Sequence, residues 1–228
     1  MAAPGLGLIL HTRANTAGLA ATADAARAAG AETIGRTGEL ADPALPEILI
    51  AAALARFGRL DALVANAGYA DRTPLAQLTD AAFERALAAN LVAFHRLVRA
   101  ALPALRAAPD GRILAVSAFG ARAIRPGLPV FPATAAAKAG LEVLVRALAL
   151  ELAPDGIAVN AVIPGFIEKE GGTRSALDPA TRAAQSAAIP LGRLGRPEEV
   201  AAALAFFLAP ETRGITGARL AVDGGVML

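Results

Sequence analysis

Apolar and polar positions follow two different periods along this chain from about residue 40 onward. Short apolar runs typical of buried strands are separated by longer segments in which apolar residues recur at roughly helical spacing. The expected helices cover 42–57, 80–107, 134–152 and 197–208, and the expected strands cover 61–65, 112–117, 157–163 and 220–222. Strands that alternate with helices in this way predict an α/β fold, a parallel sheet covered by helices on both faces.

The composition fits a single domain of this class. A chain of 228 residues is long enough to bury roughly 70% of the surface of its unfolded form. Hydrophobic residues make up 55% of the chain but aromatic residues only 4%, which favours closely packed helices over a sheet. No linker or low-complexity segment interrupts the pattern, so we expect one domain over 1–228.

Charge and residue usage exclude several classes of function. The net charge is only +2, from scattered basic and acidic residues, so nucleic acid is not an expected partner. The chain has no cysteine, which excludes thiolate chemistry, and its two histidines, His11 and His95, cannot form a metal site by themselves, so we expect none. The longest apolar runs, such as 200–209, are too short to span a membrane. We therefore expect a cytoplasmic protein that binds no membrane.

Short motifs stand at the ends of the predicted strands and inside the predicted helices. They are Asn66-Ala-Gly68, Asn90 in Ala-Ala-Asn-Leu-Val, Ser117, Lys138-Ala-Gly-Leu, Asn160-Ala-Val-Ile-Pro164-Gly165 and Val222-Asp-Gly-Gly225. In this order and spacing, residues 39–228 resemble the short-chain dehydrogenase/reductase family. The resemblance implies a Rossmann-like, doubly wound parallel sheet in three α/β/α layers, with NAD or NADP as the cofactor.

The resemblance also implies a catalytic Tyr-x-x-x-Lys motif, and here the chain departs from the family. Lys138 is present, but Thr134 stands where the tyrosine is expected, and Phe131 stands at the longer spacing that enoyl reductases use. The only tyrosine, Tyr69, is expected to be a packing or rim residue. An aliphatic hydroxyl titrates far above a phenol, so Thr134 is not a substitute proton donor. Ser117, Lys138 and Asn90 remain as catalytic candidates, either vestigial or weak.

The amino-terminal 38 residues carry only a degenerate form of the cofactor-binding portion. In one register, 11–18 replaces the glycine-rich phosphate turn and keeps only Gly18 of its glycines. In a second register, 7–12 is the family's second strand and 22–29 the helix after it, so that the first strand and the phosphate loop are missing. Both registers predict a cofactor half shortened by about one strand-helix unit.

The remaining cofactor-binding candidates are Gly18, Asn66, Gly68, Pro164 and Gly165. The family commonly places a threonine after Pro164-Gly165 to bind the nicotinamide carboxamide. Lys169 follows Phe166-Ile-Glu168 here instead, and a phosphate or a carboxylate is its hypothetical partner.

These departures lead to three hypotheses. The leading one is a non-catalytic subunit that binds no cofactor itself and stabilises an active, paralogous hydroxyacyl or ketoacyl oxidoreductase in a tetramer. The first alternative is an active NAD(P)-dependent oxidoreductase with an atypical cofactor site, in which Ser117, Lys138 and a water transfer the proton. The second alternative is a homo-oligomer that binds a small ligand. The substrate and the choice between NAD and NADP stay open.

Overall fold

A computed structural model of the chain describes residues 2–168 and 178–228. The helices are α1 (Thr16–Ala28), α2 (Leu45–Phe57), α3 (Asp80–Leu87), α4 (Ala93–Ala107), α5 (Pro132–Leu152), α6 (Pro179–Ala187) and α7 (Pro197–Leu208). The strands are β1 (Gly7–Thr12), β2 (Glu32–Thr37), β3 (Ala62–Ala65), β4 (Arg112–Val116), β5 (Ala158–Pro164) and β6 (Arg219–Val222). The alternation confirms the predicted α/β class.

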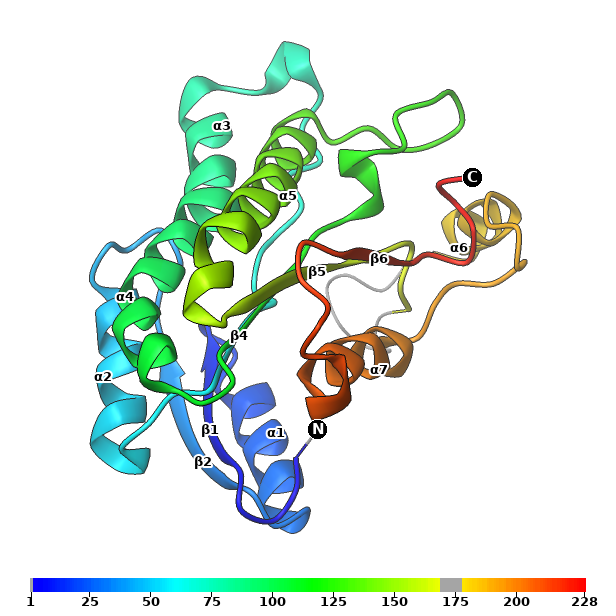
Figure 1. Ribbon diagram of the computed structural model, residues 1–228. Coiled ribbons are helices and arrows are strands. Elements are labelled where there is room, and N and C mark those ends of the chain that lie inside the picture. Colours follow the sequence, from blue (N-terminus) through cyan, green and yellow to red (C-terminus); the bar gives the residue numbers. More distant parts are fainter. Residues whose placement is uncertain (1, 169–177) are drawn as a thin grey trace.

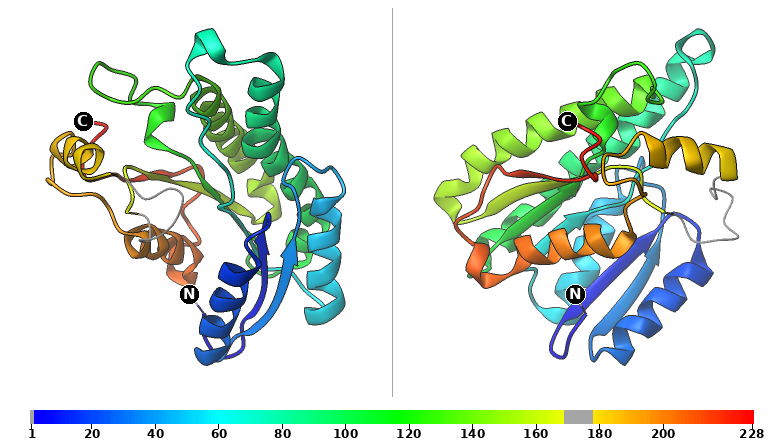
Figure 2. Two further views of the ribbon diagram at one scale, coloured as in Figure 1. Left: turned by 180° about the vertical axis from the view of Figure 1, so that it is seen from behind. Right: turned by 90° about the vertical axis from the view of Figure 1, so that its right-hand side faces the viewer.

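The larger sheet is parallel and has the strand order β3-β4-β5-β6. Every residue of β4 is buried, and β5 is buried over all but its last residue. Such complete burial requires helices on both faces. Figures 1 and 2 show α2, α4 and α5 on one face and α1 and α7 on the other, so the molecule has the predicted three layers.

Two apolar clusters lie between these layers. On the side of α4 and α5, the buried members include Phe94, Leu105, Ile113, Leu141 and Val159. On the side of α7, Val200, Leu204 and Phe207 pack against Leu114 and Val162. The sheet is therefore packed on both faces. This packing positions the carboxyl ends of β4 and β5.

The amino-terminal strands β1 and β2 form a separate, parallel two-stranded sheet. Within the described residues, no backbone pairing joins β1 to β3. In the usual order of a doubly wound dinucleotide-binding sheet, the first strand lies beside the fourth. The unpaired edges favour the second register, in which the strand that should lie between β1 and β3 is missing.

The expected helix over 80–107 is continuous but not regular. A π-turn at Ala88–Val92 separates α3 from α4, and Asn90 lies inside it. π-turns of this kind are frequently found at functional sites. No described helix is long and apolar enough to cross a membrane.

Candidate active site

Lys138 lies in the second turn of α5, with its side chain directed at the end of β4. Its Nζ donates a hydrogen bond of 2.7 Å to the carbonyl oxygen of Val116, and only 7% of the residue is exposed. No described carboxylate forms an ion pair with it. Burial without a counter-charge disfavours the ammonium form and lowers the pKa of Lys138 from 10.5 to about 8.

Thr134 lies one turn before Lys138 and is also buried. Its Oγ1 accepts a hydrogen bond of 2.8 Å from the backbone N–H of Asp71. The hydroxyl therefore fixes the loop after β3 against the first turn of α5. This is a structural use of the position at which the family resemblance places a tyrosine.

Ser117 follows β4 directly and is directed toward α5. Its hydroxyl donates a 2.7 Å hydrogen bond to Oε1 of Glu142. The other carboxylate oxygen accepts a 2.7 Å hydrogen bond from Nε of Arg122 and lies 3.8 Å from Nη1 of Arg219. The Ser117 hydroxyl hydrogen is thus committed to the buried Glu142 carboxylate. Its oxygen can still accept a hydrogen bond from another group.

Asn90 and Gly68 come together with Lys138. The Asn90 side-chain amide donates to the carbonyls of Tyr69 and Ala86, at 3.1 and 3.0 Å. Its Oδ1 is buried and has no partner among the described residues. A Cβ at Gly68 would lie 2.5 Å from that Oδ1 and 3.4 Å from Lys138 Nζ. A glycine is required here because the Asn90 side chain occupies the space.

Asn66 and Pro164 line one cavity beyond the ends of β3 and β5. Its volume is about 400 Å³ and its other walls are apolar, formed by Val64, Val116, Ile167, Pro197, Val200, Ala201 and Leu204. Gly165 lies nearby, and a Cβ there would be 2.7 Å from the Cα of Asp223. A slot with apolar walls and a few polar groups at its rim is a usual binding site for a flat ring.

The remaining candidates lie elsewhere. Gly18 is in the first turn of α1, and its amide N–H donates to the Asn15 side chain at 3.0 Å. His11 is within 3.0 Å of the carbonyl of Gly38, while Tyr69 contributes its backbone carbonyl and exposes 43% of its surface. Lys169 lies outside the described residues.

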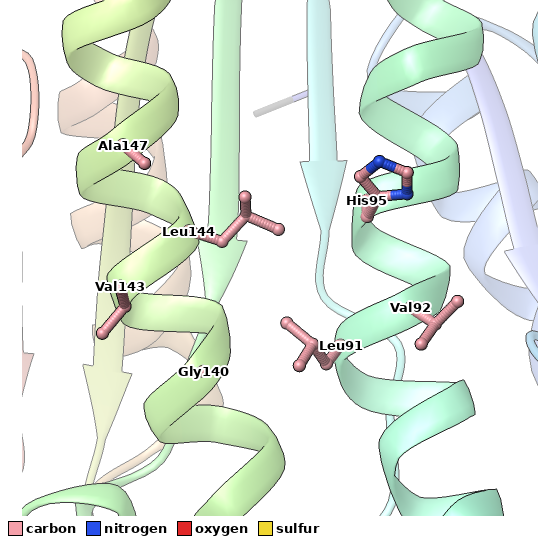
Figure 3. A pocket seen from close by; sticks show the side chains of 7 residues that line it. All are labelled: Leu91, Val92, His95, Gly140, Val143, Leu144 and Ala147. Carbon is pink, nitrogen blue, oxygen red and sulfur yellow. The ribbon is translucent and has the colours of Figure 1, made fainter.

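A second concave region lies between α4 and α5, away from Lys138. Figure 3 shows Leu91 and Leu144 facing each other across it, with His95 at the edge. The groove has a volume of about 450 Å³, and its lining is apolar apart from His95. Gly140 and Ala147 line the groove on α5.

Comparison with known proteins decides the family. A family model described as enoyl-(acyl carrier protein) reductase matches residues 1–227. The 3-oxoacyl-(acyl-carrier-protein) reductase FabG of Vibrio cholerae is 35% identical over 82% of this chain and 75% of its own length. The chain belongs to the short-chain dehydrogenase/reductase family. The corresponding FabG of Escherichia coli is 36% identical over 87% of the chain and 80% of its length.

A third relative of this short-chain dehydrogenase/reductase carries a different name. Cis-4-hydroxycyclohexanecarboxylate dehydrogenase of Sinomonas cyclohexanicum is 42% identical over 76% of this chain and 68% of its own length. The three names describe enzymes that act on a keto or a hydroxyl group.

These relatives correct the leading hypothesis of the sequence analysis. Proteins that share 35–36% of aligned residues with this chain are named as reductases, and the matching family model is also that of a reductase. The interpretation as a non-catalytic subunit is therefore wrong, and the alternative of an active oxidoreductase fits the comparisons better. The leading hypothesis rested chiefly on the absent tyrosine, whereas Lys138, kept in the first alternative, is buried at the end of β4.

Two residues of this network were not identified from the sequence. They are Glu142, which accepts a hydrogen bond from Ser117, and Arg122, which forms an ion pair with Glu142. The signal was present in α5, where a glutamate occurs four residues after Lys138 on a buried stripe whose other members, apart from Thr134 and Lys138, are apolar. A charged residue on the buried face of a helix has a partner as a rule. Its partner could not be read from the sequence, because Arg122 lies in an irregular segment after β4.

Proposed function

We propose that this chain is an NAD(P)-dependent oxidoreductase that interconverts a carbonyl and a hydroxyl group, with Lys138 as the proton-transferring group. The observation that carries the proposal is the position of Lys138 Nζ, which is buried at the end of β4 without a described counter-charge. Support also comes from the relatives, whose names describe reduction of a 3-oxoacyl group or oxidation of a ring hydroxyl.

The proton chemistry follows from the pKa of Lys138. A general acid works best when its pKa is near the working pH, and the pKa of about 8 leaves most Lys138 side chains protonated at pH 7. In the reductive direction, the Lys138 ammonium gives a proton to the substrate oxygen and becomes a neutral amine. Thr134 has no such role, because its hydroxyl is bound to the loop and titrates far too high.

Asn90 supports the return of the proton. Its buried Oδ1 has no partner in the described part of the chain, and a buried acceptor of this kind is usually satisfied by a water. A water bound there would lie near Lys138, because Oδ1 and Nζ lie 2.5 and 3.4 Å from the same point beside Gly68, and could return a proton to the amine. Ser117 acts as a positioning residue, since its hydroxyl ties β4 to Glu142 of α5.

The cavity beyond β3 and β5 suits the nicotinamide end of a dinucleotide. A bound NAD or NADP supplies or accepts the hydride. Asn66 and Pro164 line the cavity and would hold the ring; Gly165 follows Pro164 in the chain, and Gly68 lies beside Lys138. Gly18 is a weaker candidate for a phosphate contact because its N–H is already bound to Asn15.

Steady-state kinetics of the isolated chain test the proposal. With a 3-oxoacyl thioester and NADH or NADPH, we expect substrate-dependent oxidation of the nicotinamide that declines as the pH rises through about 8, where Lys138 loses its proton. Lys138→Ala should lose this activity. Arg146→Ala, which changes an exposed residue of the same helix, should keep it. Turnover by Lys138→Ala within about threefold of the parent would contradict Lys138 as the acid.

We also propose that a second copy of this chain covers the groove between α4 and α5. Val143 beside the groove is 64% exposed and Leu150, further along α5, is 82% exposed. Apolar side chains this exposed on one helix mark an interaction surface. Light scattering should give a multiple of 22.9 kDa for the parent and for Ile48→Asp on α2, and a smaller mass for Val143→Asp. A monomeric parent would refute this assembly.

A further inference from the structure

Lys138 and Asn90 bring two incompletely paired groups to one place. The Lys138 ammonium has three N–H donors, and within the described residues only the carbonyl of Val116 accepts one of them. Oδ1 of Asn90 is a buried acceptor with no partner in the same part of the chain. Nζ and Oδ1 lie 3.4 and 2.5 Å from one point beside Gly68. Because buried polar groups are normally paired, this donor and this acceptor mark the position of a small polar ligand.

The polar groups on either side of Lys138 in α5 are directed elsewhere. One turn further on, Glu142 accepts the hydrogen bond of Ser117. One turn before, Thr134 accepts a hydrogen bond from the backbone N–H of Asp71. Burial therefore acts on Lys138 without compensation and lowers its pKa to about 8. At pH 7 about one-tenth of the side chains are neutral amines, against fewer than about one in a thousand for an exposed lysine.

A neutral, desolvated lysine amine is a nucleophile toward carbonyl carbon. Its lone pair forms the C–N bond, and one N–H proton moves to the carbonyl oxygen, which becomes the hydroxyl of a carbinolamine. The C–O bond then breaks, and the hydroxyl leaves with the second N–H proton as water, so that an imine remains. One amine and one carbonyl are consumed and one water is released. No cofactor or further reactant is needed.

The surroundings of Nζ suit this intermediate. The new hydroxyl of the carbinolamine is attached to the carbon that binds Nζ, and it supplies the donor that Asn90 Oδ1 lacks. It would take the place of a water bound there. The carbonyl of Val116 accepts the N–H that stays on Nζ until water leaves.

The amine also lies beside the cavity beyond β3 and β5. Val116 lines that cavity and binds Nζ through its carbonyl oxygen. Asn66, two residues before Gly68, lines it as well. Since only 7% of Lys138 is exposed, a compact aldehyde or ketone is the class of ligand that suits this enclosed position.

We propose that Lys138 is also an imine-forming site for small aldehydes and ketones, with Asn90 accepting the hydrogen bond of the carbinolamine hydroxyl. In the proposed oxidoreduction the substrate oxygen faces Nζ and the ammonium gives a proton, whereas here the carbonyl carbon faces Nζ and the neutral amine reacts. No nicotinamide takes part, so this reaction goes beyond the proposed function and does not rest on it.

Reductive trapping tests the site, because the sequence has only two lysines, Lys138 and Lys169. The purified chain is incubated near neutral pH with acetone and sodium cyanoborohydride, which reduces an imine to a stable secondary amine, and its peptides are weighed by mass spectrometry. We expect Lys138 to gain the mass of acetone less one oxygen atom at least about tenfold faster than Lys169. Labelling of Lys138 no faster than Lys169 would overturn the proposal.

Unfolding the chain in urea provides the first control. The burial that activates Lys138 is then lost, so we expect Lys138 and Lys169 to be labelled at the same rate. A preference for Lys138 that survives in urea would come from its neighbours in the sequence and not from the folded site, which would also overturn the proposal.

Asn90→Asp tests whether these atoms form the site. A carboxylate at this position favours the ammonium form of Lys138, and a rise of one unit in its pKa lowers the neutral fraction about tenfold. We expect labelling of Lys138 to fall by about that factor and labelling of Lys169 to stay the same. Asn15→Asp, on the exposed cap of α1, should change neither.

Circular dichroism shows whether Asn90→Asp is folded. Undiminished labelling of Lys138 in the folded variant would contradict the proposed site. Trapping is measured without nicotinamide, so it separates the two activities. Labelling of Lys138 in a chain that does not turn over NADH or NADPH would support imine formation and refute only the oxidoreduction, and turnover without labelling would do the reverse.

Discussion

Replacing Lys138 by methionine should change how the stability of the protein depends on pH. Methionine keeps much of the length and apolar character of the lysine side chain but removes its charge. Burial lowers the pKa of Lys138 from 10.5 to about 8 in the folded protein, while the unfolded chain keeps the ordinary value. Each unit of difference corresponds to about 1.4 kcal/mol, so the shift is worth about 3 kcal/mol.

The sign follows from the protons bound in each state. Below about pH 8, both folded and unfolded Lys138 carry a proton, and the parent bears the full cost of a buried ammonium. Between about pH 8 and 10.5 the unfolded state binds one proton more than the folded state, so the free energy of unfolding rises with pH. Lys138→Met has no such group, and its free energy of unfolding lacks this rise.

Urea unfolding of both proteins between pH 6 and 10.5 measures the effect. Every other titrating group is common to the two proteins, so the difference between their unfolding free energies isolates Lys138. That difference should move by about 3 kcal/mol in favour of the parent as the pH rises. The loss of the bond to Val116 adds a constant of about 1 kcal/mol and does not change the slope. A pH-independent difference would refute the lowered pKa and the proton role built on it.

Three further substitutions test the site. Gly68→Ala should cost roughly 1–3 kcal/mol in urea unfolding, because its Cβ would lie 2.5 Å from a buried amide oxygen. Gly120→Ala, which meets nothing within 4 Å, should cost under about 0.5 kcal/mol. Thr134→Val loses one hydrogen bond and should be destabilised by about 1 kcal/mol, yet keep kcat within about threefold if its hydroxyl is not the acid. Glu142→Ala should cost about 2–3 kcal/mol, since it leaves the buried Ser117 hydroxyl and the partly buried Arg122 guanidinium unpaired. Glu151→Ala on the exposed side of α5 should change stability little. Equal losses of stability in the two variants would contradict the buried network.

The fold was predictable where burial imposes a period on the sequence. α7 begins at Pro197 and ends at Leu208, as the apolar spacing predicts, and Gly58 ends α2 with a φ of 71°. β2 and α6 were not identified because β2 is exposed over most of its length and α6 buries no residue. An element with little buried surface carries little hydrophobic periodicity, so pattern alone does not define it.

The site was predictable as a set of positions and not as a set of bonds. Lys138 of α5 faces the end of β4, Gly68 follows β3, and Asn90 lies in the turn between α3 and α4 beside both. The hydrogen bond from Ser117 to Glu142 and the π-turn around Asn90 depend on side-chain direction and on one irregular turn. Neither leaves a periodic signal in the sequence.

The absent tyrosine does not by itself decide against the proposed activity. Proton donation requires a group that titrates near neutral pH in the right place, and a phenol is only one means of supplying it. Here the apolar contacts of α5 lower the pKa of a lysine into that range. The proposed donor therefore depends on packing around β4 and α5, where every residue of β4 is buried. The first 38 residues, where β1 and β2 are partly exposed, take no part in this burial, so the proposed role of Lys138 does not depend on them.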